Sequence, residues 1–328
     1  MSSGRRMKLN SGYEVPVIGL GTWQSNPNEV AKAVEHALRN GYRHIDGALV
    51  YGNEHEVGEG IRASGVPRSE IFLTSKLWNT FHHPDDVEAG IDLTLKDLGT
   101  DYVDLYLIHW PVSFAPQREN PRELFPIDPA TGATHVVDVP DADTWRAMER
   151  LVELGKARSI GVSNFTRERL EKLLQTARIK PAVNQIEAHP YLQQRELLEW
   201  HKQQGIVVQA YSPTGNNIYG KPKPMDDPVV LEVASRVGRT PAQVLVQWAA
   251  QRGTVVLPKS VTPSRIDENF VDFELPADEV KKLDALERHA RYNFPARLGV
   301  DIFGEATQEE LKGAVQAFIE QQKAAKKA

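Results

Sequence analysis

Short apolar runs alternate with longer amphipathic stretches along almost the whole chain, and this alternation constrains the fold most. Most of the short runs are uniformly apolar, as is typical of parallel strands covered on both faces. The longer stretches carry apolar residues at helical spacing, and three of them end on Gly41, Gly99 or Gly205. We predict eight strands, at Pro16–Gly21, Tyr42–Asp46, Ile71–Lys76, Val103–His109, Ala157–Val162, Ala182–Glu187, Ile206–Tyr211 and Thr254–Pro258.

Eight strands, each followed by a helical stretch, predict an α/β protein built as a closed (β/α)₈ TIM barrel. The main alternative is an open doubly wound sheet, which normally carries G-x-G-x-x-G after its first strand. The first predicted strand here leads into "GLGTWQ", where the third glycine is missing and no helix opens at the glycines. The sequence therefore favours the barrel.

Three segments lie outside the repeat. Residues 7–15 predict an N-terminal hairpin that turns at Ser11-Gly12 and plugs the bottom of the barrel. Residues 111–140 form a long Pro-rich loop after the fourth strand, and loops of that length usually serve function. Residues 275–328 form a C-terminal extension. Because no stretch reads as a linker, we expect residues 1–328 to form a single barrel domain.

Composition excludes several classes of function. The formal net charge of −5 and the absence of clustered basic residues argue against a nucleic-acid partner. The chain has no cysteine, and neither a signal peptide nor an apolar run of about 20 residues is present, which indicates a cytoplasmic protein without a membrane partner. We expect no metal site and interpret "FHHPDD" as a solvated helix start, with His82, His83, Asp85 and Asp86.

Four polar residues fall at or just after the carboxyl ends of three consecutive predicted strands, which is where barrels place functional groups. They are Asp46, Tyr51, Lys76 and His109. Taken singly, each has an ordinary structural explanation as a turn residue, a packing residue, a surface lysine or a core histidine. The coincidence of all four at one rim favours a catalytic site.

These residues stand in a series of ordered blocks: "GLGTW", "HID" with "YGNE", "TSKLW", "DLYLIHWP", "GVSNF", "VNQIE", "AYSP" and "LPKSVTPSRIDEN". Over residues 7 to 304 the chain resembles the aldo-keto reductase superfamily, whose Asp, Tyr, Lys and His tetrad matches the four residues. "GNNIYG", "TPSRI" and "RYNFPARLGVDIFGE" resemble more narrowly the aldehyde reductases and NADP-linked glycerol dehydrogenases. The resemblance implies reduction of aldehydes or ketones to alcohols.

The physical chemistry of the tetrad agrees with that resemblance. Carbonyl reduction needs a hydride on carbon and a proton on oxygen. A tyrosine is a weak acid, with an ordinary pKa near ~10, and an adjacent ammonium lowers that pKa. We therefore expect Tyr51 to be the general acid, Lys76 to tune it and Asp46 to hold the lysine. His109 would donate a hydrogen bond to the substrate oxygen.

The resemblance also implies an NADPH/NADP⁺ site. Ser163, Asn164 and Gln185 would bind the nicotinamide carboxamide and Tyr211 would stack on the ring. The cations of Lys259 and Arg265 and the hydroxyls of Ser260 and Thr262, near the eighth strand, suit the 2′-phosphate of NADPH. We therefore expect the protein to prefer NADPH over NADH, although not strictly. The full set of expected cofactor-binding residues is Gly21, Thr22, Trp23, Asp46, Ser163, Asn164, Gln185, Tyr211, Ser212, Pro213, Lys259, Ser260, Thr262, Arg265, Glu268 and Asn269.

Three indoles after strand ends, with the catalytic histidine, predict an apolar substrate pocket. These residues are Trp23, Trp78, His109 and Trp110. Further candidates are Phe114 and Phe125 in the long loop and Tyr292 and Phe294 near the C-terminus. Two alternatives stay open beside reduction of small carbonyl compounds: an NADP-dependent polyol or glycerol dehydrogenase, and an NADPH-binding regulatory protein with weak turnover. We expect a monomer, as for most relatives in this resemblance.

Overall fold

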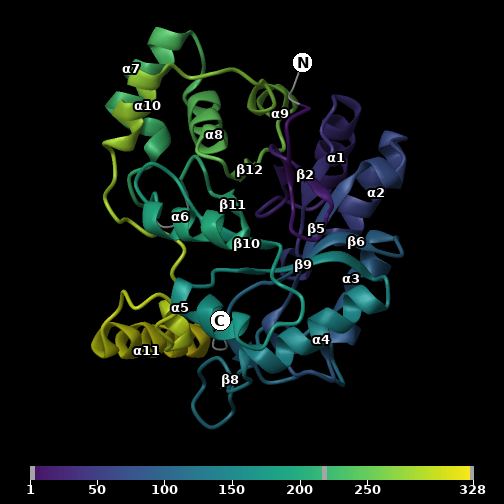
Figure 1. The fold of residues 1–328 in the computed structure, drawn as a ribbon. Coiled ribbons are helices and arrows are strands. Elements are labelled where there is room, and N and C mark those ends of the chain that lie inside the picture. The colour runs from purple at the N-terminus through teal and green to yellow at the C-terminus, as the bar shows by residue number, and fades with distance from the viewer. Residues whose placement is uncertain (1–3, 216–219, 326–328) are drawn as a thin grey trace.

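The computed structural model describes residues 4–215 and 220–325 and contains an eight-stranded parallel sheet (Figure 1). Isolated bridges Ile18↔Val256 and Gly21↔Lys259 join its first and last strands and close it into a barrel. The predicted (β/α)₈ fold is thus confirmed. Its strands are β3 (Leu20–Gly21), β4 (His44–Asp46), β5 (Phe72–Leu77), β6 (Val103–Ile108), β9 (Ala157–Ser163), β10 (Val183–Glu187), β11 (Val207–Tyr211) and β12 (Val255–Leu257).

The first predicted strand is divided in two. Its Pro16 belongs to the N-terminal hairpin, and only Leu20–Gly21 forms part of the barrel ladder. Between them the backbone switches partners, because the Val17 amide bonds to Arg5 and the Gly19 amide bonds to Val256. The single predicted run therefore joins two sheets.

Helices follow the barrel strands, and their ends carry the expected local signals. The helix α8 begins with a capping box between Thr240 and Gln243, and α3 and α6 end on the left-handed Gly99 and Gly205. The helices around the barrel are α1 (Val30–Arg39), α2 (Glu54–Ser64), α3 (Val87–Leu98), α4 (Asp141–Glu153), α5 (Arg167–Leu174), α6 (Arg195–Gln204), α7 (Pro228–Val237), α8 (Pro241–Gln251), α9 (Pro263–Asn269) and α10 (Ala277–Asp284). Five 3₁₀ turns are also described, at η1 (Leu49–Tyr51), η2 (Arg68–Glu70), η3 (Asn79–Phe81), η4 (Pro224–Asp226) and η5 (Ala296–Leu298).

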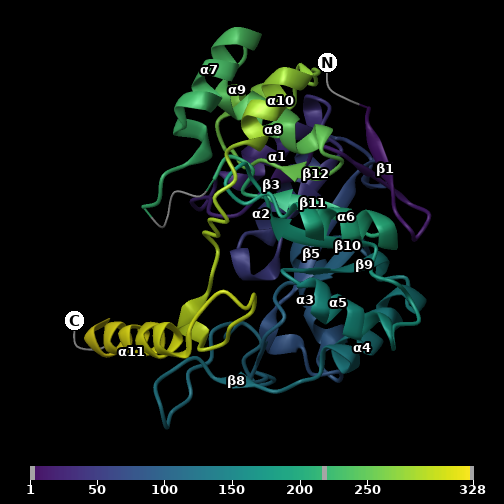
Figure 2. The same ribbon diagram turned by 60° about the vertical axis from the view of Figure 1, so that its left-hand side comes forward.

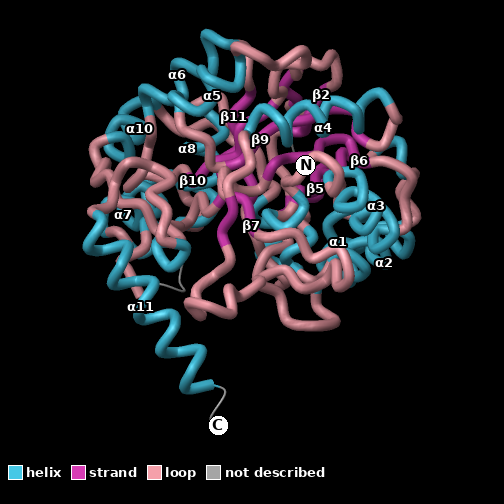
Figure 3. Tube along the Cα trace, turned by 90° about the horizontal axis from the view of Figure 1, so that it is seen from below, coloured by secondary structure: helices cyan, strands magenta, loops and turns pink. Residues whose placement is uncertain are grey.

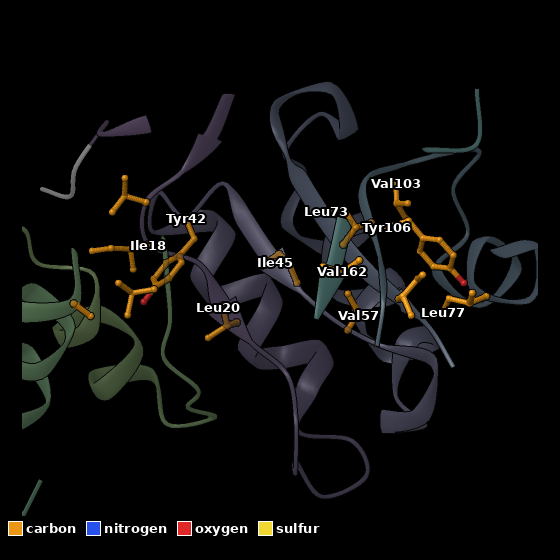
Figure 4. Close-up of a cluster of buried hydrophobic side chains, with 14 of the residues drawn as sticks. Ile18, Leu20, Tyr42, Ile45, Val57, Leu73, Leu77, Val103, Tyr106 and Val162 are labelled. Carbon is orange, nitrogen blue, oxygen red and sulfur yellow. The ribbon is translucent and has the colours of Figure 1, made fainter. Parts of the chain in front are cut away.

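Two apolar cores stabilise the barrel. The larger one lies between strands and helices, and Figure 4 shows part of it, with Leu73 and Leu77 of β5 and Val57 of α2. The smaller one includes Phe72 and is closed by the hairpin of β1 (Arg6–Lys8) and β2 (Glu14–Pro16), which contributes Val15. Since Phe72 and Leu73 lie in different cores, alternate residues of β5 face the inside and the outside of the barrel. The hairpin plugs the barrel as predicted.

The two long segments are more ordered than their sequences suggest. In the loop 111–140, β7 (Ser113–Phe114) pairs with β8 (Val136–Val137). The C-terminal extension carries α11 (Gln308–Ala325), which lies apart from the ring of barrel helices and projects outward in Figures 2 and 3. Within the described residues, no helix is both long and apolar enough to span a membrane.

The start of α3 differs from its prediction as a solvated helix start. His82 is buried and contacts the Ser113 hydroxyl through Nδ1, at 3.1 Å. Asp86 is also buried and accepts hydrogen bonds from Arg118 of the long loop. The prediction is wrong for these two residues, because the loop after the fourth strand folds back over them.

Two glycines in helices provide a test of the fold, because one is tightly packed and the other is open to solvent. The open one reports helix propensity alone. A methyl group at Gly58 of α2 would lie 2.2 Å from the Leu98 carbonyl oxygen, whereas one at Gly313 of α11 meets nothing within 4 Å. We expect Gly58→Ala to lower the free energy of unfolding by about 2–3 kcal/mol. Gly313→Ala should be neutral or raise it by up to ~1 kcal/mol. Urea unfolding followed by circular dichroism measures both, and equal stabilities would contradict the packing described.

Candidate active site

A buried lysine is the centre of the candidate site. Lys76 lies on β5 and is 0% exposed. Its ammonium donates to Asp46 Oδ1 at 2.7 Å and to the Gly47 carbonyl at 2.7 Å, and lies 3.4 Å from the Tyr51 hydroxyl. Asp46 ends β4, and Tyr51 ends the 3₁₀ turn η1 that follows. The structure thus brings three of the four predicted catalytic residues into one chain of hydrogen bonds.

His109 completes the predicted tetrad from the end of β6. Its ring lies edge-on to Tyr51, with the ring centroids 5.8 Å apart, and edge-on to Trp78 at 5.3 Å. Burial, followed by the charge of Lys76, holds the pKa of His109 well below its usual value. The imidazole is therefore neutral at neutral pH and carries one N–H that it can donate.

The electrostatics of Tyr51 differ in part from the sequence prediction. Burial raises the pKa of Tyr51 most, and the charge of Lys76 lowers it but does not prevail, so the net pKa is above the usual value. Lys76 lowers the pKa of Tyr51 as expected, but desolvation, which that expectation did not include, outweighs the effect of the lysine. Burial lowers the pKa of Lys76, but Asp46 and Tyr51 together raise it by more than burial lowers it. The net pKa of Lys76 therefore lies above its usual value. Tyr51 is a protonated phenol beside a charged ammonium.

Asn53 and Glu54, which follow Tyr51, hold the turn η1 in place. The side-chain Nδ2 of Asn53 donates to the Thr22 carbonyl at 2.9 Å, and the Glu54 carboxyl group accepts from the Ser75 hydroxyl at 2.5 Å. Burial raises the pKa of Glu54 to about 8, so this side chain is mostly protonated at pH 7. Because Ser75 precedes Lys76, the Glu54 contact ties the segment that carries the phenol to the strand that carries the lysine.

The site opens into a cavity of about 760 Å³ at the carboxyl ends of the strands. Most predicted site residues line it, while Lys76 sits behind Tyr51 and is not part of the lining. The predicted residues in the lining are Gly21, Thr22, Trp23, Asp46, Tyr51, Trp78, His109, Trp110, Ser163, Asn164, Gln185, Tyr211, Ser212, Pro213 and Lys259.

The amide and hydroxyl groups predicted to bind a carboxamide form one network beside the tetrad. Gln185 donates to Asp46 Oδ2 at 2.7 Å. Asn164 donates to the His109 carbonyl at 3.0 Å and accepts from the Tyr211 hydroxyl at 2.7 Å. The Ser163 hydroxyl donates to the Gln185 carbonyl at 2.8 Å. The predicted cofactor residues are therefore linked directly to the predicted catalytic residues.

Five predicted cofactor residues lie outside this cavity, in and just before α9. They are Ser260, Thr262, Arg265, Glu268 and Asn269. Arg265 is exposed and, within residues 4–215 and 220–325, has no ion-pair partner. Lys259, at the near end of the group, lines the cavity and donates to the Gln24 carbonyl at 2.7 Å. The cationic group thus extends from the cavity onto the surface. Residues 216–219, which include part of "GNNIYG", lie outside the described residues.

The sequence did not identify most of one cavity wall. Phe114, Phe125 and Phe294 line the cavity as suggested, but Tyr292 does not, since its hydroxyl donates to the Pro222 carbonyl. Other lining residues were not among the predicted site residues: Gln24, Val50, Asn79, Thr214, Gly215, Leu257, Asn293, Pro295, Ala296, Arg297 and Leu298. The last five come from a stretch without periodicity, and only the fold brings it over the barrel mouth.

A family model described as the aldo/keto reductase family matches residues 17–288. The chain belongs to the aldo/keto reductase family. Members of this family are oxidoreductases that act on carbonyl compounds, and the predicted family and enzyme class are confirmed. The match ends before the part of the C-terminal segment that lines the cavity.

Individual relatives agree with the family match. The chain is 46% identical over 299 residues to aldo-keto reductase family 1 member A1 of Cricetulus griseus, covering 88% of this chain and 91% of that protein. It is 45% identical over 336 residues to D/L-glyceraldehyde reductase of Hypocrea jecorina, covering 97% and 99%. Among solved structures, the aldose reductase from Schistosoma japonicum matches with a TM-score of 0.84 and 43% identity, covering 92% of this chain and 100% of that one.

The lowered pKa of His109 leads to a measurable expectation. Because burial and the neighbouring ammonium both oppose its protonation, the imidazole should stay neutral well below the range in which a solvent-exposed histidine titrates, near pH ~6.5. In NMR spectra assigned with His109→Asn, its Cε1–H signal should not shift between about pH 8 and about pH 5.5. A titration with its midpoint inside that window would contradict the electrostatics described.

Proposed function

We propose that the protein reduces aldehydes and ketones to alcohols with NADPH. The observation that carries the proposal is the chain Asp46–Lys76–Tyr51, which ends in a cavity beside the neutral His109. A phenol backed by a buried ammonium is suited to deliver a proton to a carbonyl oxygen.

The residues in the cavity fit a nicotinamide cofactor. Ser163, Asn164 and Gln185 present a hydroxyl and two amides, whose donors and acceptors match those of a carboxamide. Tyr211 adds an aromatic face beside them. When bound there, the cofactor would supply the hydride.

The chain's own residues handle the proton and the charge. Tyr51 donates its phenolic proton to the substrate oxygen, and the Lys76 ammonium stabilises the phenolate left behind. Asp46 keeps the lysine charged and aimed at the phenol. His109, as a neutral donor, orients the substrate oxygen and stabilises negative charge that develops on it.

Trp23, Trp78 and Trp110 form an apolar lining for the part of the substrate beyond its carbonyl group. Oxidation of a polyol such as glycerol is the same chemistry in the opposite direction, and the relative named D/L-glyceraldehyde reductase supports small polar substrates. A single domain, a monomeric state and a cytoplasmic location stay predictions from the sequence.

Replacing the proposed acid separates an enzyme from a cofactor-binding regulator. We expect Tyr51→Phe to lower kcat at least ~100-fold because the proton donor is lost. The NADPH dissociation constant should stay within about threefold, since the phenol serves the reaction rather than cofactor binding. Absorbance of the reduced cofactor with a panel of aldehydes and ketones measures turnover, and Tyr13→Phe, at an exposed tyrosine of the hairpin, is the control. Wild-type protein that binds NADPH tightly but turns over no carbonyl would support the regulator instead.

A second variant tests the choice of cofactor. Arg265 is the exposed cation proposed to pair with the 2′-phosphate. Arg265→Ala should raise the NADPH dissociation constant about tenfold and the NADH constant less than about twofold, since NADH lacks that phosphate. Fluorescence titrations with both nucleotides measure the difference. Equal weakening of the two would overturn the assignment.

A further inference from the structure

Glu187 is a buried carboxylate that the proposed reaction does not use. It ends β10, two residues after Gln185, and is 0% exposed. One carboxylate oxygen lies 2.9 Å from His189 Nε2. The backbone amides of Tyr292 and Asn293 donate to the carboxylate, at 3.0 and 3.2 Å from Tyr292 and at 2.8 Å from Asn293.

These contacts explain why a buried carboxylate is tolerated there. Burial raises the pKa of Glu187, but His189 and the two backbone amides lower it further, so the net pKa lies below its usual value. The side chain is therefore an anion whose partners are the nearby His189 and two backbone N–H groups from a distant part of the chain. Removing the carboxylate would take a charged acceptor away from two buried N–H groups, which is costly.

The amides that Glu187 holds stand at the start of a cavity wall. We define this C-terminal wall as residues 293–298, all of which line the cavity. The wall contains no strand that could fix its position by ladder pairing, and its one regular element is the short turn η5. Its position must therefore come from side-chain and packing contacts.

Side-chain and packing contacts are found on both sides of the wall. Before it, the amides of Arg288 and Ala290 donate to the Tyr191 carbonyl, and the Tyr292 ring lies 5.0 Å from the ring of His189. Beyond it, α11 packs on η5, where Arg297 lies over the ring of Phe318 at 5.3 Å. Glu187 is the charged contact at the end of the wall nearer the barrel.

We propose that Glu187 is a positioning residue for substrate selection. Its carboxylate fixes the position of the C-terminal wall over the cavity. Because the wall limits the space in the cavity, its position determines how bulky a group can follow the carbonyl group of the substrate. Glu187 touches neither the reacting atoms nor the cofactor site in this role. The inference rests on the proposed function, and it ties a residue within the matched family region to a wall that lies beyond it.

Variants at Glu187 test the proposal with two aldehydes. Propanal has little bulk beyond its carbonyl group, whereas 4-nitrobenzaldehyde carries a substituted ring there, so the proposal predicts that only the second is sensitive to the wall. In Glu187→Ala we expect KM for 4-nitrobenzaldehyde to rise about tenfold, with KM for propanal and the NADPH dissociation constant changed less than about twofold. Glu187→Gln keeps the shape and one acceptor oxygen, so it should shift KM in the same direction by about threefold. It also keeps the test valid if the alanine variant does not fold.

Glu149 provides a matched control. It is a buried carboxylate of α4 that likewise accepts two backbone amides, from Arg178 and Ile179, but it is not part of the cavity lining. Glu149→Ala should lower stability to a similar extent and leave the ratio of the two KM values unchanged. If both glutamate variants change that ratio alike, or if Glu187→Ala changes KM equally for both aldehydes, the proposal is overturned.

Hydrogen exchange gives a readout that does not need turnover. The amides of Tyr292 and Asn293 should exchange at least ~10-fold faster in both Glu187 variants and at the wild-type rate in Glu149→Ala. Unchanged exchange would overturn the anchoring role even if the enzyme is active. If the wild-type protein reduces no carbonyl compound, the proposed function is wrong, and so is the role of Glu187 in substrate selection. The exchange data would still decide whether Glu187 holds the wall in place.

Discussion

The buried pair of Lys76 and Asp46 is the interaction on which the site depends. An ammonium that is 0% exposed needs a counter-charge, and the carboxylate 2.7 Å away supplies it. Breaking such a pair by removing one partner costs about 3–5 kcal/mol, because the other charge is left uncompensated. The same pair presents a stable positive charge to Tyr51. Stability and chemistry are therefore set by one contact between neighbouring strands.

The surroundings of the pair extend it in two directions. Gln185 donates to the second oxygen of Asp46, so the same carboxylate meets both the lysine and the proposed cofactor site. On the outer side of β5, Ser75 bonds to Glu54, three residues after the phenol. Because alternate residues of a strand face opposite sides, Lys76 points into the barrel while Ser75 points to the helices. The position of the phenol is thus determined from both faces of one strand.

The cavity combines a regular half and an irregular half. The strand ends and the turn after β4 supply Asp46, Tyr51, His109 and the proposed carboxamide-binding group, whereas the long loop and the C-terminal wall supply much of the remaining surface. In a barrel, the strands fix where the reaction takes place, and the segments after them vary which substrates reach it. Glu187 is notable in this arrangement because it belongs to a strand but contacts the irregular half.

The sequence alone determined the barrel and the place of four polar residues at one rim of it, while the expected cofactor residues came from the resemblance to a family. The barrel and the rim are local signals, because parallel strands bring their carboxyl ends together and each residue's place on or just after its own strand locates it. The net pKa of Tyr51, the burial of His82 and the wall of residues 293–298 needed the tertiary structure. Desolvation depends on every neighbour that excludes water, and the irregular wall is placed by contacts between residues about a hundred positions apart. Neither the extent of desolvation nor the position of the wall can be predicted from the spacing of residues along the chain.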